Sequence, residues 1–115
     1  MAKPLVAVFT AQYHADIAML RKQGHDLGEL VKAMDFLVNR KTLPRKYHDH
    51  QLSGILRKSR DLHIEPDWLL IYTYIGRNKI RLECTGTHQH VLREVPAALG
   101  MMKGKSTSPA SSGGS

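Results

Sequence analysis

The chain has 115 residues, of which 42% are hydrophobic and 23% are charged, a length and composition typical of one globular domain. It contains no apolar run near the roughly 20 residues of a membrane span, and its single cysteine excludes an internal disulfide, so we expect a cytoplasmic protein without membrane contact. Seventeen Lys and Arg against ten Asp and Glu give a net charge of +7, which favours a polyanionic partner.

The first half of the chain predicts a strand followed by two helices. Residues 4–9 are rich in β-branched and aromatic side chains, as strands are. Helical periodicity begins near Ala11 and ends at Gly24, a residue suited to a helix C-terminus. Asp26, with Glu29 three residues later, resembles a capping box for a second helix that ends near Arg40 and Lys41. Its apolar stripe consists of Leu27, Leu30, Val31, Met34, Leu37 and Val38.

The second half predicts a loop and then a series of strands. Residues 44–51 lack an amphipathic period, whereas residues 55–64 have a β-like composition. Residues 68–75 give the clearest strand signal, and residues 76–78 have turn chemistry. Residues 79–85 alternate, which predicts that Ile80, Leu82 and Cys84 share one face and that Lys79, Arg81 and Glu83 share the other.

These elements predict an α+β fold. The N-terminal strand and an antiparallel helical hairpin are expected to pack on one face of a mainly antiparallel sheet, leaving the other face open. Residues 1–102 are interpreted as one domain. Residues 103–115 contain no large apolar side chain and are expected to form a disordered Ser/Gly-rich tail or an artificial linker.

Several histidines in the basic C-terminal half indicate acid–base chemistry on RNA. An imidazole can both accept and donate a proton near neutral pH, and RNA supplies its own nucleophile in the 2′-hydroxyl. Cleavage then needs a base, an acid and positive charge near the phosphate. We predict that these proton transfers use no metal and involve His50, His63, Asp67 and His88. Candidate RNA contacts are Arg45, Lys46, Lys58, Arg60, Arg81 and the aromatic ring of Trp68.

Two alternative roles for the histidines remain open. His48 with His50, and His88 with His90, are two residues apart and would lie on one side of an extended strand. Together with His63 or Asp67, such pairs could bind zinc or nickel. Alternatively, individual histidines only make hydrogen bonds at the ends of loops, which is the interpretation preferred for His14, His25, His48 and His90.

Three separated blocks carry a family resemblance. They are residues 47–54 (YHDHQLSG), 60–72 (RDLHIEPDWLLIY) and 85–88 (TGTH). In sequence, order and spacing they resemble the YafQ-type toxins of the RelE superfamily, and with the helical hairpin the resemblance covers roughly residues 6–92. The resemblance implies the RelE-like fold.

The resemblance also implies a function. It points to a bacterial type II toxin, a small endoribonuclease without a cofactor that enters the ribosomal A site and cuts mRNA to a 2′,3′-cyclic phosphate and a 5′-hydroxyl. It implies a cognate antitoxin of the DinJ/RelB type that covers the basic cleft, and contact with operator DNA only through the toxin–antitoxin complex. By position, the proton-transfer and phosphate-positioning set would be His50, His63, Asp67 and His88, and Trp68 would contact mRNA.

Two positions depart from the family pattern. Cys84 stands where the family usually has an arginine before the Thr-Gly-Thr-His block, and Leu92 replaces a common aromatic residue. A neutral thiol cannot stabilise charge on the phosphate, and loss of one such contact typically costs about 10²–10³-fold in rate. Strand alternation places Arg81 on the other face, so we expect weakened cleavage, and Cys84→Arg should raise it. The main alternative is a non-catalytic relative that binds the ribosome, RNA or antitoxin.

Overall fold

The computed structural model describes residues 3–52 and 58–99. The predicted tail at 103–115 and residues 55–57 of the predicted β-like segment lie outside the described residues. The described elements, in chain order, are β1 (Val6–Phe9), α1 (Ala11–Lys22), α2 (Gly28–Val38), the 3₁₀ turn η1 (Arg45–Tyr47), β2 (His50–Gln51), β3 (Ser59–Glu65), β4 (Trp68–Ile75), β5 (Lys79–Gly86) and α3 (His88–Leu99).

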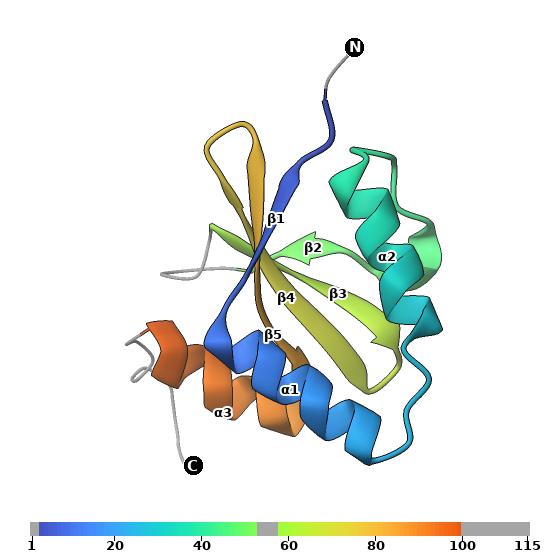
Figure 1. Ribbon diagram of the computed structural model, residues 1–115, viewed down its shortest axis with the longest axis vertical. Helices are drawn as coiled ribbons and strands as arrows, with labels where there is room; N and C mark the ends of the chain where they lie inside the picture. Colours follow the sequence, from blue (N-terminus) through green and yellow to red (C-terminus); the bar gives the residue numbers. More distant parts are fainter. Residues whose placement is uncertain (1–2, 53–57, 100–115) are drawn as a thin grey trace.

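The strands form one sheet in the order β1-β5-β4-β3-β2 (Figure 1). The pairs β2–β3, β3–β4 and β4–β5 are antiparallel, and β1 runs parallel to β5 at the edge. The predicted α+β fold with a mainly antiparallel sheet is therefore confirmed. The short strand β2 was predicted as loop, because two residues are too few to give a periodic signal.

Both predicted N-terminal helices are present. Thr10 caps α1 by accepting the backbone N–H of Tyr13 at 2.9 Å, and Gly24 follows the helix with φ +84°. Asp26 accepts the backbone N–H of Gly28 at 2.9 Å, as predicted, but the Glu29 carboxylate binds Tyr47 instead of closing a capping box. The helix α2 also ends earlier than expected, at Val38.

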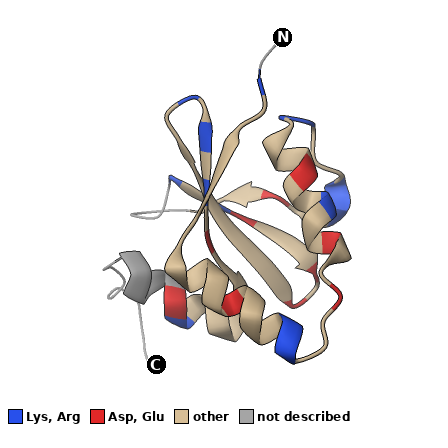
Figure 2. Cartoon of the chain, viewed as in Figure 1, with Lys and Arg blue, Asp and Glu red and all other residues tan. Residues whose placement is uncertain are grey.

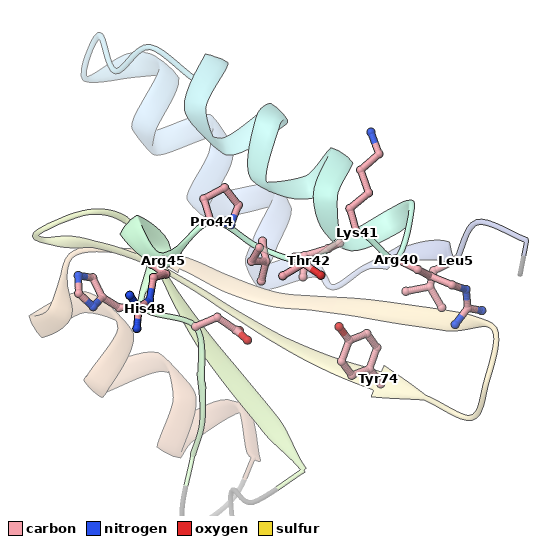
Figure 3. A pocket seen from close by; sticks show the side chains of 11 residues that line it. Leu5, Arg40, Lys41, Thr42, Pro44, Arg45, His48 and Tyr74 are labelled. Carbon is pink, nitrogen blue, oxygen red and sulfur yellow. The ribbon is translucent and has the colours of Figure 1, made fainter.

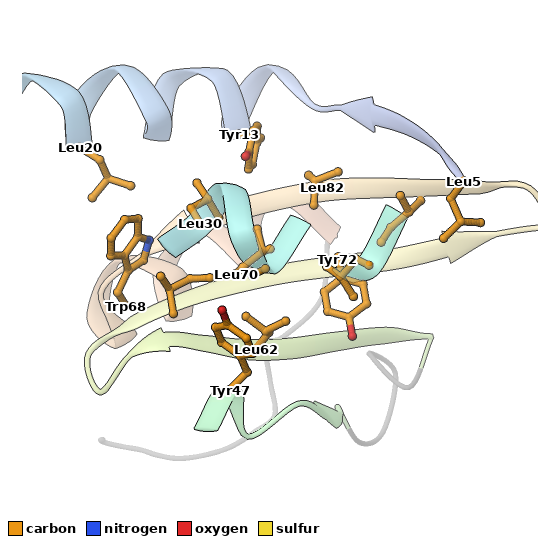
Figure 4. Packing of buried hydrophobic residues seen from close by; sticks show 14 residues of the cluster. Leu5, Tyr13, Leu20, Leu30, Tyr47, Leu62, Trp68, Leu70, Tyr72 and Leu82 are labelled. Carbon is orange, nitrogen blue, oxygen red and sulfur yellow. The ribbon is translucent and has the colours of Figure 1, made fainter. Parts of the chain in front are cut away.

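The main core lies between the sheet and the pair α1 and α2 (Figure 4). The helix α1 packs over β5, and α2 packs near β3. The buried residues of this core include Tyr13, Leu20, Leu30, Leu37, Tyr47, Leu62, Trp68, Leu70, Tyr72, Ile80 and Leu82. Since Trp68, Leu70 and Tyr72 alternate along β4 and all enter this core, the residues between them, such as Leu69 and Ile71, face the opposite side of the sheet.

A β-bulge changes the predicted faces of β5. Ile71 pairs with Cys84 while the next residue, Tyr72, pairs with Leu82, so Glu83 is an extra residue in β5. Beyond such a bulge the alternation of faces is reset. The prediction that Cys84 shares a face with Leu82 is therefore wrong, because Cys84 packs in a second cluster on the opposite side. Arg81 and Cys84 consequently lie on the same face of the sheet, contrary to the sequence interpretation.

The helix α3 was not predicted, and it covers part of the face expected to be open. Val91 of α3 packs with Leu69, Ile71 and Cys84, and Leu52 adds to this second cluster. Thr87 provides the helix start, since its Oγ1 accepts the backbone N–H of His90 at 3.2 Å. That threonine before Val91 was the available sequence signal. Within the described chain, the helices are all too short or too polar to cross a membrane.

Candidate active site

The three predicted catalytic histidines meet on the face of the sheet opposite α1 and α2. The ring centroids of His63 and His88 are 5.4 Å apart, and those of His50 and His63 are 6.3 Å apart. His48 adds a fourth ring, 5.8 Å from that of His63. The sequence favours only hydrogen bonding at a loop end for His48, but its ring reaches the cluster because a left-handed residue conformation (φ 46°) turns the chain just before β2.

Asp67, in the turn between β3 and β4, holds His88 at the start of α3. Its Oδ1 accepts the backbone N–H of His88 at 2.9 Å and lies 2.7 Å from the ring Nδ1. These two hydrogen bonds, the backbone bond first, lower the pKa of Asp67 below its usual value. Because an ionised carboxylate only accepts, Nδ1 carries the proton and Nε2 is the ring nitrogen left for a substrate.

His50 is oriented by the backbone. Its Nδ1 donates to the carbonyl oxygen of His48 at 2.9 Å, and a carbonyl can only accept. The neutral ring therefore has its lone pair on Nε2. The same Nδ1 lies 3.1 Å from Oδ1 of Asp61, a buried carboxylate that the sequence did not single out.

Asp61 and His63 share the floor of the cluster. Burial raises the pKa of Asp61, and the neighbouring histidines oppose this shift. Burial lowers the pKa of His63, and the rings of His88, His48 and His50 lower it further when charged, while Asp61 opposes the shift. Asp61 Oδ1 and His63 Nδ1 are both buried without a hydrogen-bond partner among the described residues. The two groups are thus held in an environment that disfavours charge.

The lowered pKa of His63 predicts how stability depends on pH. Below the unfolded value near 6.5 the unfolded chain binds a proton that the folded ring resists, so stability should fall as pH falls from about 7.5 to about 5.5. The Asp61 shift has the opposite sign, since its stability contribution is present below about pH 4 and is lost as pH rises through the raised pKa of the folded carboxyl group.

We expect His63→Gln to flatten the decline in the free energy of unfolding between these two pH values. Urea denaturation at several pH values measures it, and His14→Gln, which replaces an exposed ring on α1, is the matched control. An unchanged slope in His63→Gln would show that another group causes the decline.

One hollow is lined by several of the clustered histidines, and a second one meets the cluster only at His48. One of about 710 Å³ is lined by Lys46, His48, His50, His63, Ile64, Glu65 and Pro66. A larger one of about 830 Å³, the basic groove, lies between the α2–β2 loop and β4 (Figure 3) and is also lined by His48. Arg45 and His48 lie at one end of the basic groove and Arg40 at the other, with Tyr74 nearer the Arg40 end (Figure 3).

The predicted RNA-binding cations differ in how free they are. Arg45 and Lys46 lie exposed on η1, where Figure 2 shows basic residues grouped, and Lys58 is exposed just before β3. The Nζ atom of Lys46 is paired with Oε2 of Glu29 at 3.4 Å. Arg60 donates to Asp49 at 2.8 Å, and Asp49 also accepts the Tyr72 hydroxyl, so this guanidinium fixes the loop between His48 and His50. Arg81 donates to Glu83 at 2.9 Å.

Trp68 and Cys84 are both buried. Only 3% of Trp68 is exposed, its indole N–H donates to the Thr85 hydroxyl at 2.9 Å, and the ring of His25 packs edge-on against it. The expected stacking of an RNA base on Trp68 therefore has no open ring face here. Cys84 is 1% exposed, and burial raises the pKa of its thiol to about 12, so it is a neutral core residue. Leu92 is exposed.

The arrangement does not support the alternative of paired metal-binding histidines. Residues 88–90 are helical, so His88 and His90 point to different partners, Asp67 and Asp16. Across residues 3–52 and 58–99, no three His, Cys, Asp or Glu side chains are placed to hold a metal ion.

Comparison with known proteins assigns the chain to a class. The model of a family described as the bacterial toxin YafQ of type II toxin–antitoxin systems matches residues 5–93. The mRNA interferase toxin YafQ of Escherichia coli K12 is 40% identical over 81 residues, which cover 70% of this chain and 87% of that protein. The chain is thus a toxin of the type II toxin–antitoxin class.

Solved structures agree with this assignment. The toxin in a crystal structure of the E. coli DinJ–YafQ toxin–antitoxin complex superimposes with a TM-score of 0.71 at 36% identity, covering 76% of this chain and 97% of that one. A metal-bound toxin from Helicobacter pylori gives the same TM-score at 33% identity, covering 76% and 98%. The chain belongs to the YafQ family, as its three sequence blocks predicted.

Proposed function

We propose that the chain is an mRNA interferase that cuts mRNA in the ribosomal A site by acid–base catalysis without a metal. The observation that supports this most is the meeting of His50, His63 and His88, with Asp67 behind His88, on one face of the sheet. We take residues 1–102 as the toxin domain and residues 103–115 as a tail outside it.

The chemistry follows from the free ring nitrogens. One imidazole nitrogen takes the proton of the RNA 2′-hydroxyl, and O2′ then attacks the adjacent phosphorus. The bond from phosphorus to O5′ breaks, and a second imidazolium protonates O5′, giving a 2′,3′-cyclic phosphate and a 5′-hydroxyl. Neutral His50 and His88 each have Nε2 available for such a transfer. Because neighbouring rings titrate together, the two roles are not assigned to single residues.

The charge near the histidines supports an RNA substrate. The net charge is +7, and the basic groove continues from His48 away from the cluster. A single strand that crosses the histidines could therefore place its next phosphates beside Arg45. The same basic surface suits an acidic segment of a cognate antitoxin, which would block RNA and carry the toxin to operator DNA.

We expect Arg45→Gln to weaken binding of single-stranded RNA and to reduce the slope of log affinity against log salt by about 0.7, the value for one lost phosphate contact. Fluorescence anisotropy with a labelled oligonucleotide measures this slope. Arg21→Gln removes the same charge from an exposed position on α1 that does not line the basic groove, so it should leave the slope unchanged. Equal losses in both variants would indicate only a general effect of net charge.

The proposed activity is tested by primer extension on mRNA under translation in a purified system. Cleavage within A-site codons by the wild-type chain supports an enzyme. Ribosome binding without any cleavage would instead support the alternative of a non-catalytic family member, in line with the missing arginine at Cys84.

A further inference from the structure

A second carboxylate–histidine pair lies beside the active site, outside the residues that the resemblance assigns. Asp16 on α1 is only 3% exposed. Its Oδ1 lies 2.7 Å from Nε2 of His90 on α3 and accepts the Gln12 amide at 2.8 Å, while its Oδ2 accepts the backbone N–H of Thr85 at 3.0 Å. A carboxyl group this deeply buried needs such hydrogen-bond donors. The Asp16–His90 pair therefore ties α1 to the turn that leads from β5 into α3.

The His90 ring also packs against this turn. Gly86 has φ +152°, and a Cβ added there would lie only 2.7 Å from Cδ2 of His90. The ring thus occupies the space that a side chain at position 86 would fill. Thr87, the next residue, caps α3 through the backbone N–H of His90. The ring, the turn and the helix start consequently fit together as one unit.

This unit carries His88. Residues of an α-helix are rotated by about 100° each, so His88 and His90 project from nearly opposite sides of the first turn of α3. Asp67 holds the His88 side, and Asp16 holds the His90 side. Asp67 and the buried Asp16 thus hold opposite sides of the first turn of α3. Together they fix the rotation of this turn about the helix axis. That rotation decides where Nε2 of His88 points.

We propose that His90 is a positioning residue for the cleavage reaction, acting through Asp16 and the Thr85–Thr87 turn to set the direction of His88. This inference rests on the proposed function for its catalytic consequence. His90 itself faces α1, in a hollow of about 410 Å³ that it shares with Asp16, His25 and Trp68, so it acts through His88.

The test compares three variants of the full chain with the wild type. His90→Ala removes the bond to Asp16, whereas the amide of His90→Gln can still donate from nearly the same place. His14→Ala removes an exposed ring from α1 and serves as the control. Cleavage rates are measured at saturating and sub-saturating toxin on translated mRNA. Long-range ¹H–¹⁵N spectra of the imidazoles report the state of His88 without any need for cleavage, and melting temperatures confirm folding.

We expect His90→Ala to lower the cleavage rate at saturation by about 10- to 100-fold with little change in the half-saturating concentration, because a small misplacement of a reacting group acts on the chemical step. The His88 ring signals should shift in His90→Ala, while His90→Gln and His14→Ala should resemble the wild type. If His90→Ala does not fold, His90→Asn, whose amide is too short to reach Asp16, replaces it.

Two results would overturn the proposal. One is a wild-type rate with unshifted His88 signals in His90→Ala. The other is an equal loss in His90→Gln and His90→Ala, which would mean that the imidazole itself acts on RNA. If the wild-type chain cuts no mRNA, the proposed function fails, and the His88 signals alone then decide whether His90 positions that ring.

Discussion

Replacing His88 by alanine should reduce mRNA cleavage by about 10²–10⁴-fold, the usual contribution of one acid–base group. The ring stands at the meeting point of the site, 5.4 Å from that of His63 and bound to Asp67. The backbone N–H of residue 88 still donates to Asp67 in the variant, so the start of α3 should keep one anchor. The expected loss is therefore chemical and not a loss of the fold.

The same primer-extension assay measures this loss, with equal melting temperatures as the check on folding. His14→Ala should cut like the wild type, because its ring lies exposed on α1. Combining His50→Ala with His88→Ala should cost less than the product of the two single losses, since groups that act as a unit are not additive. Full cleavage by His88→Ala would exclude the proposed chemistry at this site.

The elements that the sequence predicted are those whose signal is local. The two N-terminal helices have a clear apolar period, and Thr10 and Asp26 mark their starts by hydrogen bonds within three residues. The hairpin between β4 and β5 has glycine in its turn at φ +59°. By contrast, α2 ends before Arg40 because that residue adopts φ +57° and donates to the carbonyls of Lys3 and Arg77, which are far away in sequence.

The candidate catalytic residues were predicted from chemistry and resemblance, but their surroundings were not. Asp61 and His48 join the cluster only because β2 pairs with β3, which places His50 opposite Asp61. Asp16 is a charged residue within the helical period of α1, and its partner His90 lies 74 residues later. Long-range partners of this kind leave no periodic pattern in the sequence.

The bulge at Glu83 causes the wrong prediction with the largest consequence, the face of the sheet on which Cys84 lies. A single extra residue in β5 reverses the face of everything after it, and strict alternation had no means to reveal it. The bulge places Cys84 under α3 and brings Arg81 to the same face of the sheet. Arg81 remains paired with Glu83, whose other donor is Thr73. A shift of Arg81 toward the phosphate would have to break this pairing.

Cys84→Arg should therefore destabilise the fold before it can improve cleavage. The thiol is 1% exposed and touches a cluster with Leu69, Ile71 and Val91. An arginine there overfills the cluster and buries a cation, for a combined cost of about 3 kcal/mol or more. For a domain of this size that corresponds to a melting temperature lower by about 10 °C or more. Cys84→Ala, which leaves only a small cavity, should cost about 1 kcal/mol.

Measuring denaturation and cleavage on the same Cys84→Arg sample separates the effect of the guanidinium on stability from its effect on the cleavage rate. If the side chain escapes from beneath Val91 toward the histidines, cleavage per folded molecule should rise by up to about 10²-fold, as for a regained oxyanion contact. Escape requires α3 to move away from β4 and β5, so the rise in activity and the loss of stability should occur together. A Cys84→Arg protein as stable as the wild type would contradict the packing of α3 on Cys84. A Cys84→Arg protein that is destabilised without any gain in cleavage would show that the absent arginine does not limit the cleavage rate of this toxin.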